Sequence, residues 1–193
     1  MLTRIIRVGL VSLAFVAGVT LPAYANVAYS LCSISLVTPI QTVSSDSDVH
    51  GFRLNLLYGQ NRQVNGLDLG AVNVTTRGLM GLQVGGLNWA QGQMSGVQIG
   101  GDNVLQGIAK PGNTTDAGCV GEGNGVQLGA VNVVADARLN GIQVGIINVA
   151  DSMRGIQLGM VNVATQMRGV QIGLLNLIPS GPCVFMPIIN ASF

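Results

Sequence analysis

The sequence predicts an all-β repeat protein, and three observations carry that prediction. One nine-residue phrase recurs along most of the 193-residue chain, apolar and polar residues alternate within it, and two glycines punctuate nearly every copy. Alternation with a period of two is typical of β-strands, and a fixed longer period is typical of stacked repeats. We therefore expect a β-solenoid of about eight rungs, each built from 14–16 residues.

Composition excludes several other classes of protein. Charged residues make up 9% of the chain and aromatic residues 4%, and there are 28 glycines. An average domain has about 25% charged residues and about 7% glycine. With a formal net charge of +1 and no basic cluster, the chain lacks the electrostatic footprint of a nucleic-acid-binding protein. Its apolar content of 48% also excludes a disordered charged tail.

The first element along the chain is an export signal over residues 1–25. Arg4 and Arg7 precede an uncharged apolar run at 8–21, and residues 22–25 place small side chains at the two positions that a signal peptidase reads. The apolar run is shorter than the roughly 20 residues that a membrane-spanning helix needs. We expect cleavage after this segment and an exported mature chain.

Residues 26–50 follow as an N-terminal segment or cap. They contain the only histidine, His50, with Asp46 and Asp48 nearby. A general base at His50 is chemically conceivable, but a polar turn ahead of the repeats explains these residues more simply. The two aspartates lack the glycine-punctuated acidic loop of a calcium site. We expect no catalytic residue, no cofactor and no metal, and therefore no enzyme.

The repeat domain spans residues 51–178, and its phrase is Gly, aliphatic, Gln, aliphatic, Gly, any residue, aliphatic, Asn and Val. Glycine tolerates the positive φ that a bend needs, so both glycines are interpreted as structural bends. Side-chain amides donate and accept, so we expect Gln and Asn to form ladders between rungs. The repeat glycines are Gly66, Gly70, Gly81, Gly85, Gly96, Gly100, Gly125, Gly129, Gly141, Gly145, Gly155, Gly159, Gly169 and Gly173. The ladder amides are Gln83, Gln98, Gln127, Gln143, Gln157, Gln171, Asn73, Asn88, Asn103, Asn132, Asn148, Asn162 and Asn176.

Each rung is expected to bury its aliphatic side chains and to turn its amides outward. In one unit the inward set would be Met153, Ile156, Leu158, Val161 and Val163. A degenerate first unit begins at Gly51, where Arg53, Asn55 and Tyr58 replace the usual Gln, Gly and Asn. Because end rungs of a solenoid need protection, we interpret this unit as a cap.

An antiparallel outer-membrane β-barrel of 8–10 strands is the alternative fold. Strands of about ten residues also fit a bilayer span, and the chain ends in Phe193 after an alternating segment. Few aromatic residues are available for girdles, and an antiparallel meander would repeat every two strands rather than every one. Both architectures stay open from the residues alone.

Three further features concern the ends and the irregularities of the repeats. An insertion loop is expected at 105–124, either as a binding element or as a tolerated excursion, with Asp102 in an inward slot ahead of it. Residues 179–193 are expected to form a C-terminal strand or cap. The three cysteines, an odd number whose pairing stays open, are Cys32, Cys119 and Cys183.

The residue after the second glycine becomes larger toward the C-terminus. We expect the later members to form an exposed apolar stripe of Ala130, Ile146, Met160 and Leu174. Such a stripe suits an envelope or surface protein, a second copy of the chain or a membrane. No nucleic-acid partner is expected.

Several phrases carry a resemblance to known repeat families. Gly-Leu-Asp-Leu-Gly-Ala-Val-Asn at 66–73, Gly-Val-Gln-Leu-Gly-Ala-Val-Asn at 125–132 and the segments at 53–59 and 187–193 resemble a largely uncharacterised bacterial family of exported surface-repeat proteins. The order Gln-x-Gly-x-x-Asn-x-Ala at 143–150 is also similar to the curlin repeat of amyloid fimbriae. The resemblance implies a location at the cell surface, outer membrane or periplasm and supplies no catalytic residue.

We therefore expect an exported, non-enzymatic scaffold of the bacterial envelope that acts through structure or interaction. A small integral outer-membrane β-barrel protein is the alternative function.

Overall fold

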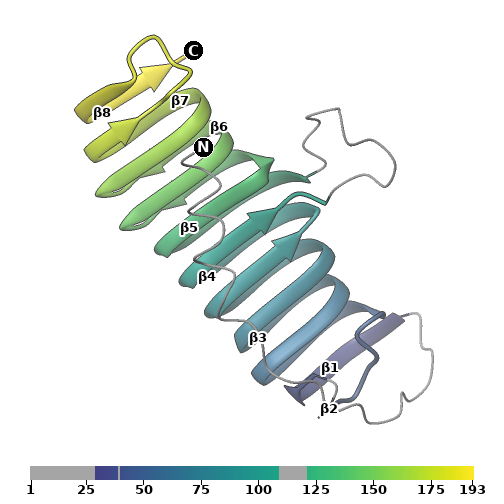
Figure 1. Ribbon diagram of the computed structural model, residues 1–193. Helices are drawn as coiled ribbons and strands as arrows, with labels where there is room; N and C mark the ends of the chain where they lie inside the picture. The colour runs from purple at the N-terminus through teal and green to yellow at the C-terminus, as the bar shows by residue number, and fades with distance from the viewer. Residues whose placement is uncertain (1–28, 39, 109–120) are drawn as a thin grey trace.

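The chain winds into an elongated β-solenoid, seen in a computed structural model that describes residues 29–38, 40–108 and 121–193 (Figure 1). The described residues form eight strands and no helix. The strands are β1 (Tyr29–Val37), β2 (Ile40–Gln41), β3 (Asp48–Gln91), β4 (Gln93–Gln106), β5 (Gly121–Val144), β6 (Ile147–Leu158), β7 (Val161–Leu177) and β8 (Phe185–Ser192). The signal segment 1–25 and Cys119 lie outside the described residues.

Neighbouring rungs pair in parallel and in register. Gly81 faces Gly96, Gln83 faces Gln98 and Asn88 faces Asn103 between β3 and β4. The same register continues through β5, β6 and β7. We name each rung by its first glycine, so that the eight rungs run from the Gly51 rung to the Gly169 rung. The parallel register confirms the repeat solenoid and shows that the antiparallel alternative is wrong.

The two ends of the solenoid are covered differently. At the N-terminal end β1 pairs in parallel with the start of β3, and β2 covers only the end of β1. At the C-terminal end β8 folds back antiparallel on β7, with Ile172 opposite Ile189. Residues 26–50 and 179–193 therefore contribute the strands that flank the repeats.

The core contradicts the expected orientation of the side chains. Every Gln and Asn of the ladder positions is completely buried, whereas Ile142, Ile147 and Ile156 are 36–38% exposed. The buried apolar residues come two places before and nine places after each first glycine. They include Leu79, Met94, Leu105, Leu139, Met153, Ala164, Met167 and Ile178.

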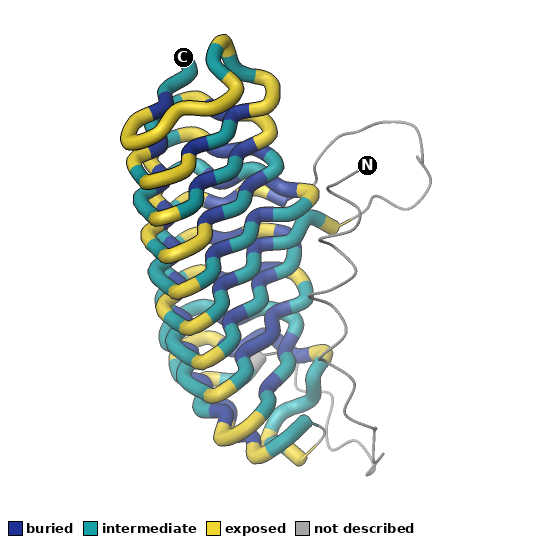
Figure 2. The backbone as a smooth tube through the Cα atoms, turned by 60° about the vertical axis from the view of Figure 1, so that its left-hand side comes forward, coloured by how far each residue is buried: buried dark blue, intermediate teal, exposed yellow. Residues whose placement is uncertain are grey.

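Strand alternation explains this correction. In the Gly155 rung, Met153 and Gln157 lie an even number of residues apart and share the inner face, so Ile156 and Leu158 must face outward. The first glycine bends the strand without inverting this alternation. Figure 2 shows the buried positions as bands that run from rung to rung along the rod.

The two glycines of a unit are required for different reasons. Gly155 has a φ of +131°, a conformation that L-residues rarely adopt. Gly159 has no such φ, but a Cβ there would lie 2.5 Å from the carbonyl oxygen of Gly145 and 2.6 Å from Asn148 Nδ2. A Cβ at Gly155 would also collide with the carbonyl oxygen of Gly141. The first glycine therefore meets a conformational and a steric need, and the second makes room for the buried asparagine of the rung before it.

Candidate functional site

The core of the solenoid contains a continuous glutamine ladder. From Gln171 to Gln83 each Nε2 donates to the Oε1 of the glutamine in the preceding rung, over 2.7–2.8 Å. Gln83 Nε2 then donates to Asp68 Oδ2 over 2.8 Å. All the side-chain donors of this ladder point toward the N-terminal end, where a carboxylate receives the last bond. Such chains of aligned amides strengthen one another in a low-dielectric interior.

The asparagine ladder runs in the opposite direction. From Asn73 to Asn162 each Nδ2 donates to the Oδ1 of the asparagine in the following rung, over 2.8–2.9 Å. The second Nδ2 hydrogen reaches a backbone carbonyl, as from Asn148 to Leu158 over 2.9 Å. Because nearly every side-chain amide of the two ladders is paired in this way, a core that contains so many buried amides is compatible with a stable fold.

The glutamine ladder ends on a buried ion pair that the residues alone did not reveal. Arg53 donates through Nε and Nη2 to the two oxygens of Asp68, at 2.7 and 2.5 Å, and both side chains are completely buried. Asn55 Nδ2 lies 3.1 Å from Asp68 Oδ1. The available signal was that Arg53 and Asp68 occupy the glutamine position of two successive units with opposite charge. The Gly51 rung thus closes the ladder electrostatically.

The region around His50 is held by structural contacts. His50 is exposed, and its Nδ1 lies 3.2 Å from Asn65 Nδ2. Asp48 accepts two bonds from Arg62, at 2.7 and 2.6 Å, and this hydrogen-bonded guanidinium holds the pKa of the carboxyl below its ordinary value of 3.8 despite the opposing effect of burial. Among residues 29–38, 40–108 and 121–193, no group of three or more His, Cys, Asp or Glu residues could hold a metal ion.

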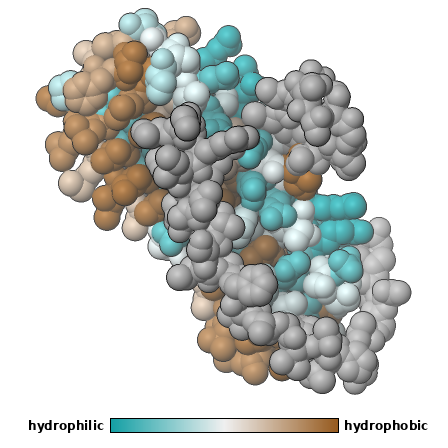
Figure 3. Space-filling model, viewed as in Figure 1, coloured by the Kyte–Doolittle hydropathy of each residue, from teal (hydrophilic) through white to brown (hydrophobic). Residues whose placement is uncertain are grey.

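The outer surface carries an apolar stripe on the edge that follows each second glycine. Ile146, Met160 and Leu174 are 52–61% exposed, and Ala130 is also exposed. Ile156, Ile172 and Leu175 widen this surface on both sides. Figure 3 shows the hydrophobic residues gathered along one side of the rod at the C-terminal end, with hydrophilic residues on the opposite side.

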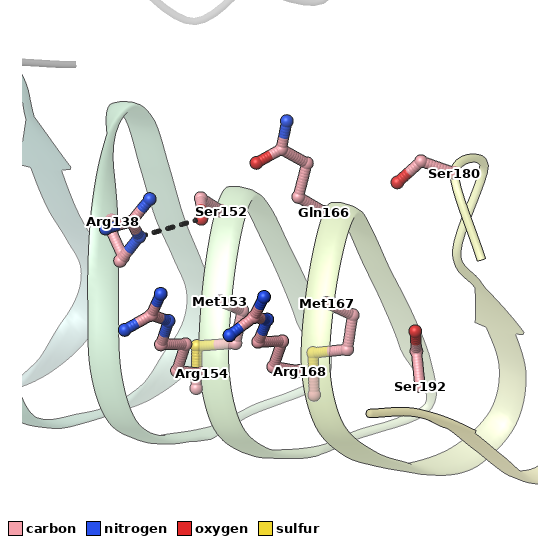
Figure 4. A pocket seen from close by; sticks show the side chains of 9 residues that line it. All are labelled: Arg138, Ser152, Met153, Arg154, Gln166, Met167, Arg168, Ser180 and Ser192. Carbon is pink, nitrogen blue, oxygen red and sulfur yellow. Dashed lines mark hydrogen bonds between the residues drawn. The ribbon is translucent and has the colours of Figure 1, made fainter. Parts of the chain in front are cut away.

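A hollow lined by arginines lies on the outer surface of the last rungs, where the residues just before each first glycine are exposed. Its volume is about 180 Å³, and we call it the arginine groove. Its lining comprises Arg138, Ser152, Met153, Arg154, Gln166, Met167, Arg168, Ser180 and Ser192. Arg154 and Arg168 are register partners on β6 and β7, and their side chains extend side by side (Figure 4). Arg138 Nε lies 3.3 Å from Ser152 Oγ. The groove was not predicted, although arginine precedes the first glycine in two successive units.

The structure also places the insertion and the cysteines. Leu105 and Asn124, the expected ends of the insertion, lie within β4 and β5. Asp102 is half-buried in the column of Leu87 and Val131, on the outer face of a strand whose next residue, Asn103, is buried, rather than inward as expected. Cys32 on β1 and Cys183 before β8 are free thiols at opposite ends of the rod. At about 4.8 Å per rung they lie far beyond disulfide reach within one chain.

Comparisons with known proteins add no relative. No family model, curated protein or solved structure matches this chain. The fold and its core therefore define the class here: a parallel β-solenoid with internal amide ladders. The described residues contain no helix of the length and hydropathy that crossing a bilayer would require.

Proposed function

We propose that this protein is an exported, non-enzymatic scaffold of the bacterial envelope that works by presenting its apolar stripe to a partner surface. The observation that carries the proposal is the exposure of Ile146, Met160 and Leu174 in successive rungs of a rigid rod. Soluble monomers rarely leave a large contiguous apolar surface uncovered. The export signal at 1–25 and the resemblance to surface-repeat proteins support the envelope as the location of the protein.

Fractionation of a bacterium that produces the full chain tests the location. We expect the protein in the envelope fraction, beginning at Asn26 by N-terminal sequencing, and released by an alkaline wash because surface contacts hold it. An uncleaved chain confined to the cytoplasm would contradict export. A pellet that resists the wash would contradict attachment by surface contact alone.

A stripe variant tests the scaffold role. Met160→Gln combined with Leu174→Gln should move protein from the envelope fraction to the soluble exported fraction. Met80→Gln is the matched control, because Met80 is 54% exposed on an N-terminal rung outside the stripe. Equal retention of both variants would contradict a role for the stripe. A catalytic activity that His50→Ala abolishes would overturn the non-enzymatic assignment.

A further inference from the structure

The arginine groove combines three arginines with a lining that, among residues 29–38, 40–108 and 121–193, includes no carboxylate. Arg154 and Arg168 are exposed and stacked in register, about 4.8 Å apart along the sheet. Neither of these two arginines takes part in the ion pairs found within the described residues, Arg53–Asp68 and Arg62–Asp48, and no carboxylate of those residues lines the groove. Like charges placed opposite each other in a sheet repel, and a bound anion would relieve this repulsion.

The groove offers the donors that a phosphate group accepts. Two guanidiniums provide charge-assisted bonds, and Ser192 brings a hydroxyl from the strand that closes the rod. The hydroxyl of Ser180 already donates to the carbonyl oxygen of Thr165. Figure 4 shows the side chains of Arg154 and Arg168 extending in the same direction, toward the rung of Arg138, with Ser192 at the other end of the row. A phosphate monoester or diester fits this chemistry.

The apolar surface next to the groove narrows the choice of anion. Ile156 lies two residues after Arg154, and Ile172 lies four residues after Arg168, on the same outer face of the strand. These two aliphatic side chains are 38% and 41% exposed. A soluble phosphate would leave that surface in water. An anionic lipid matches both parts, because its phosphate meets the arginines while its acyl region meets the apolar residues.

Two columns of the repeat change in the same sense along the rod: the residue before the first glycine gains charge and the residue after the second glycine gains apolar size toward the C-terminal end. The N-terminal strands also expose apolar side chains, among them Leu31, Leu56 and Leu57, but no pair of arginines in register accompanies these. Residues 138–193 contain three arginines and one aspartate, a net charge of +2. At the position of Arg154, the earlier rungs carry the neutral residues Met80, Ser95, Asn124 and Asn140. At the position of the apolar stripe, directly after the second glycine, the earlier rungs carry only Ala71, Gly86 and Gly101.

We propose that the C-terminal rungs dock on an anionic lipid surface, with lipid phosphates in the arginine groove and the apolar stripe against the acyl boundary. The inference rests on the proposed envelope location and identifies what the stripe meets there. Vesicle binding by the purified chain tests lipid docking without reference to the location in the cell. Fractionation tests the envelope location, so the failure of one proposal can be distinguished from the failure of the other.

Co-sedimentation with vesicles provides the measurement. The mature chain should bind phosphatidylcholine vesicles that contain phosphatidylglycerol more tightly than vesicles of phosphatidylcholine alone, and added salt should reduce the difference. Arg154→Gln with Arg168→Gln should weaken binding to the anionic vesicles roughly 30-fold, at about fivefold per arginine. Arg77→Gln is the matched control, because this exposed arginine lies on an N-terminal rung away from the groove.

Three outcomes would overturn the inference. They are binding that the double arginine variant leaves unchanged, saturation of the groove by inorganic phosphate without any vesicle binding, and a stripe already covered by a second copy in a dimer that ignores vesicles. Thermal unfolding and circular dichroism of each variant establish that it is folded. Met160→Gln with Leu174→Gln should weaken binding that persists at high salt, which separates the apolar contribution from the charged one.

Discussion

At the scale of single residues, the most unusual feature is a charged pair enclosed in an amide core. Arg53 and Asp68 are completely buried, and Asp68 also accepts the last bond of the glutamine ladder. A buried ion pair adds little stability relative to an apolar pair, but removing one partner leaves an uncompensated charge. We therefore interpret the Arg53–Asp68 pair mainly as the feature that fixes the rung at which the glutamine ladder ends, with only a small contribution to the stability of the fold.

Removing one partner of this pair should be more damaging than removing both. Arg53→Met should lower the free energy of unfolding by about 3–5 kcal/mol, because Asp68 keeps a buried charge. Adding Asp68→Gln should restore part of the loss, since glutamine continues the ladder from Gln83. Urea unfolding of the two variants measures the difference, and an equal or larger loss in the double variant would refute the explanation.

Gly159 and Gln157 allow the bend and the ladder to be compared within one rung. Gln157→Ala breaks bonds to Gln143 and Gln171, which should cost about 1–3 kcal/mol for each amide group left unpaired. Gly159→Val should cost more, because its Cβ would meet the backbone of the neighbouring rung and force two rungs apart. Thermal midpoints check the order, and equal midpoints would contradict the steric role of Gly159.

Asp48 should make the stability depend on acidic pH. Its pKa is lowered in the folded state by Arg62, so the pair stabilises the protein above pH 3.8 and loses this contribution as the pH falls through the lower folded-state pKa. Comparing urea unfolding at pH 6 and at about pH 3, the wild type should lose more stability than Asp48→Asn. A parallel decline of both proteins would show that Asp48 contributes nothing to this pH dependence.

At the scale of elements, the strands that flank the repeats cover the open edges of the stacked rungs. β8 pairs antiparallel with β7 and contains Pro187, which has no N–H to offer a further strand. An edge strand with proline is a poor template for pairing with another chain. β8 is therefore interpreted as a stop for the stacking of identical rungs.

Removal of β8 should leave β7 as an exposed edge strand that can pair with other chains. A chain ending at residue 181 would expose the backbone of β7, so we expect concentration-dependent association by size-exclusion chromatography and light scattering. Pro187→Val in the full chain gives the edge strand one further N–H and should cause a weaker form of the same association. A truncated chain that remains monomeric would refute the capping role.

At the scale of the whole molecule, the solenoid is a linear array in which each rung contacts its two neighbours. Stability in such arrays is approximately a sum over rungs and their interfaces. The register of glycines, glutamines and asparagines is unbroken from β3 to β7, including across the insertion, where Gly96 pairs with Gly125.

Deleting exactly one rung should therefore be tolerated. Removal of residues 155–168 joins Arg154 to Gly169 and leaves both ladders continuous, so the shortened chain should fold with a modestly lower midpoint. Removal of only residues 155–161 places glycines opposite amides and should abolish cooperative unfolding. Circular dichroism with thermal melts distinguishes the two, and similar behaviour of both deletions would contradict the nearest-neighbour description.

The repeat, its period, its β character and the exposed position of Ile146, Met160 and Leu174 could be predicted from the residues alone, because they follow from the spacing of residue types along the chain. The residues alone did not determine which side of each strand faces inward. Alternation permits two answers, and Gln157 alone gives no sign that it has a partner above and below. Only the stacking of rungs decides the matter, because an amide becomes compatible with a core when every neighbour supplies the complementary amide. For the same reason the arginine groove, made by register partners from separate rungs and by the strand that folds back on them, exists only in the tertiary structure.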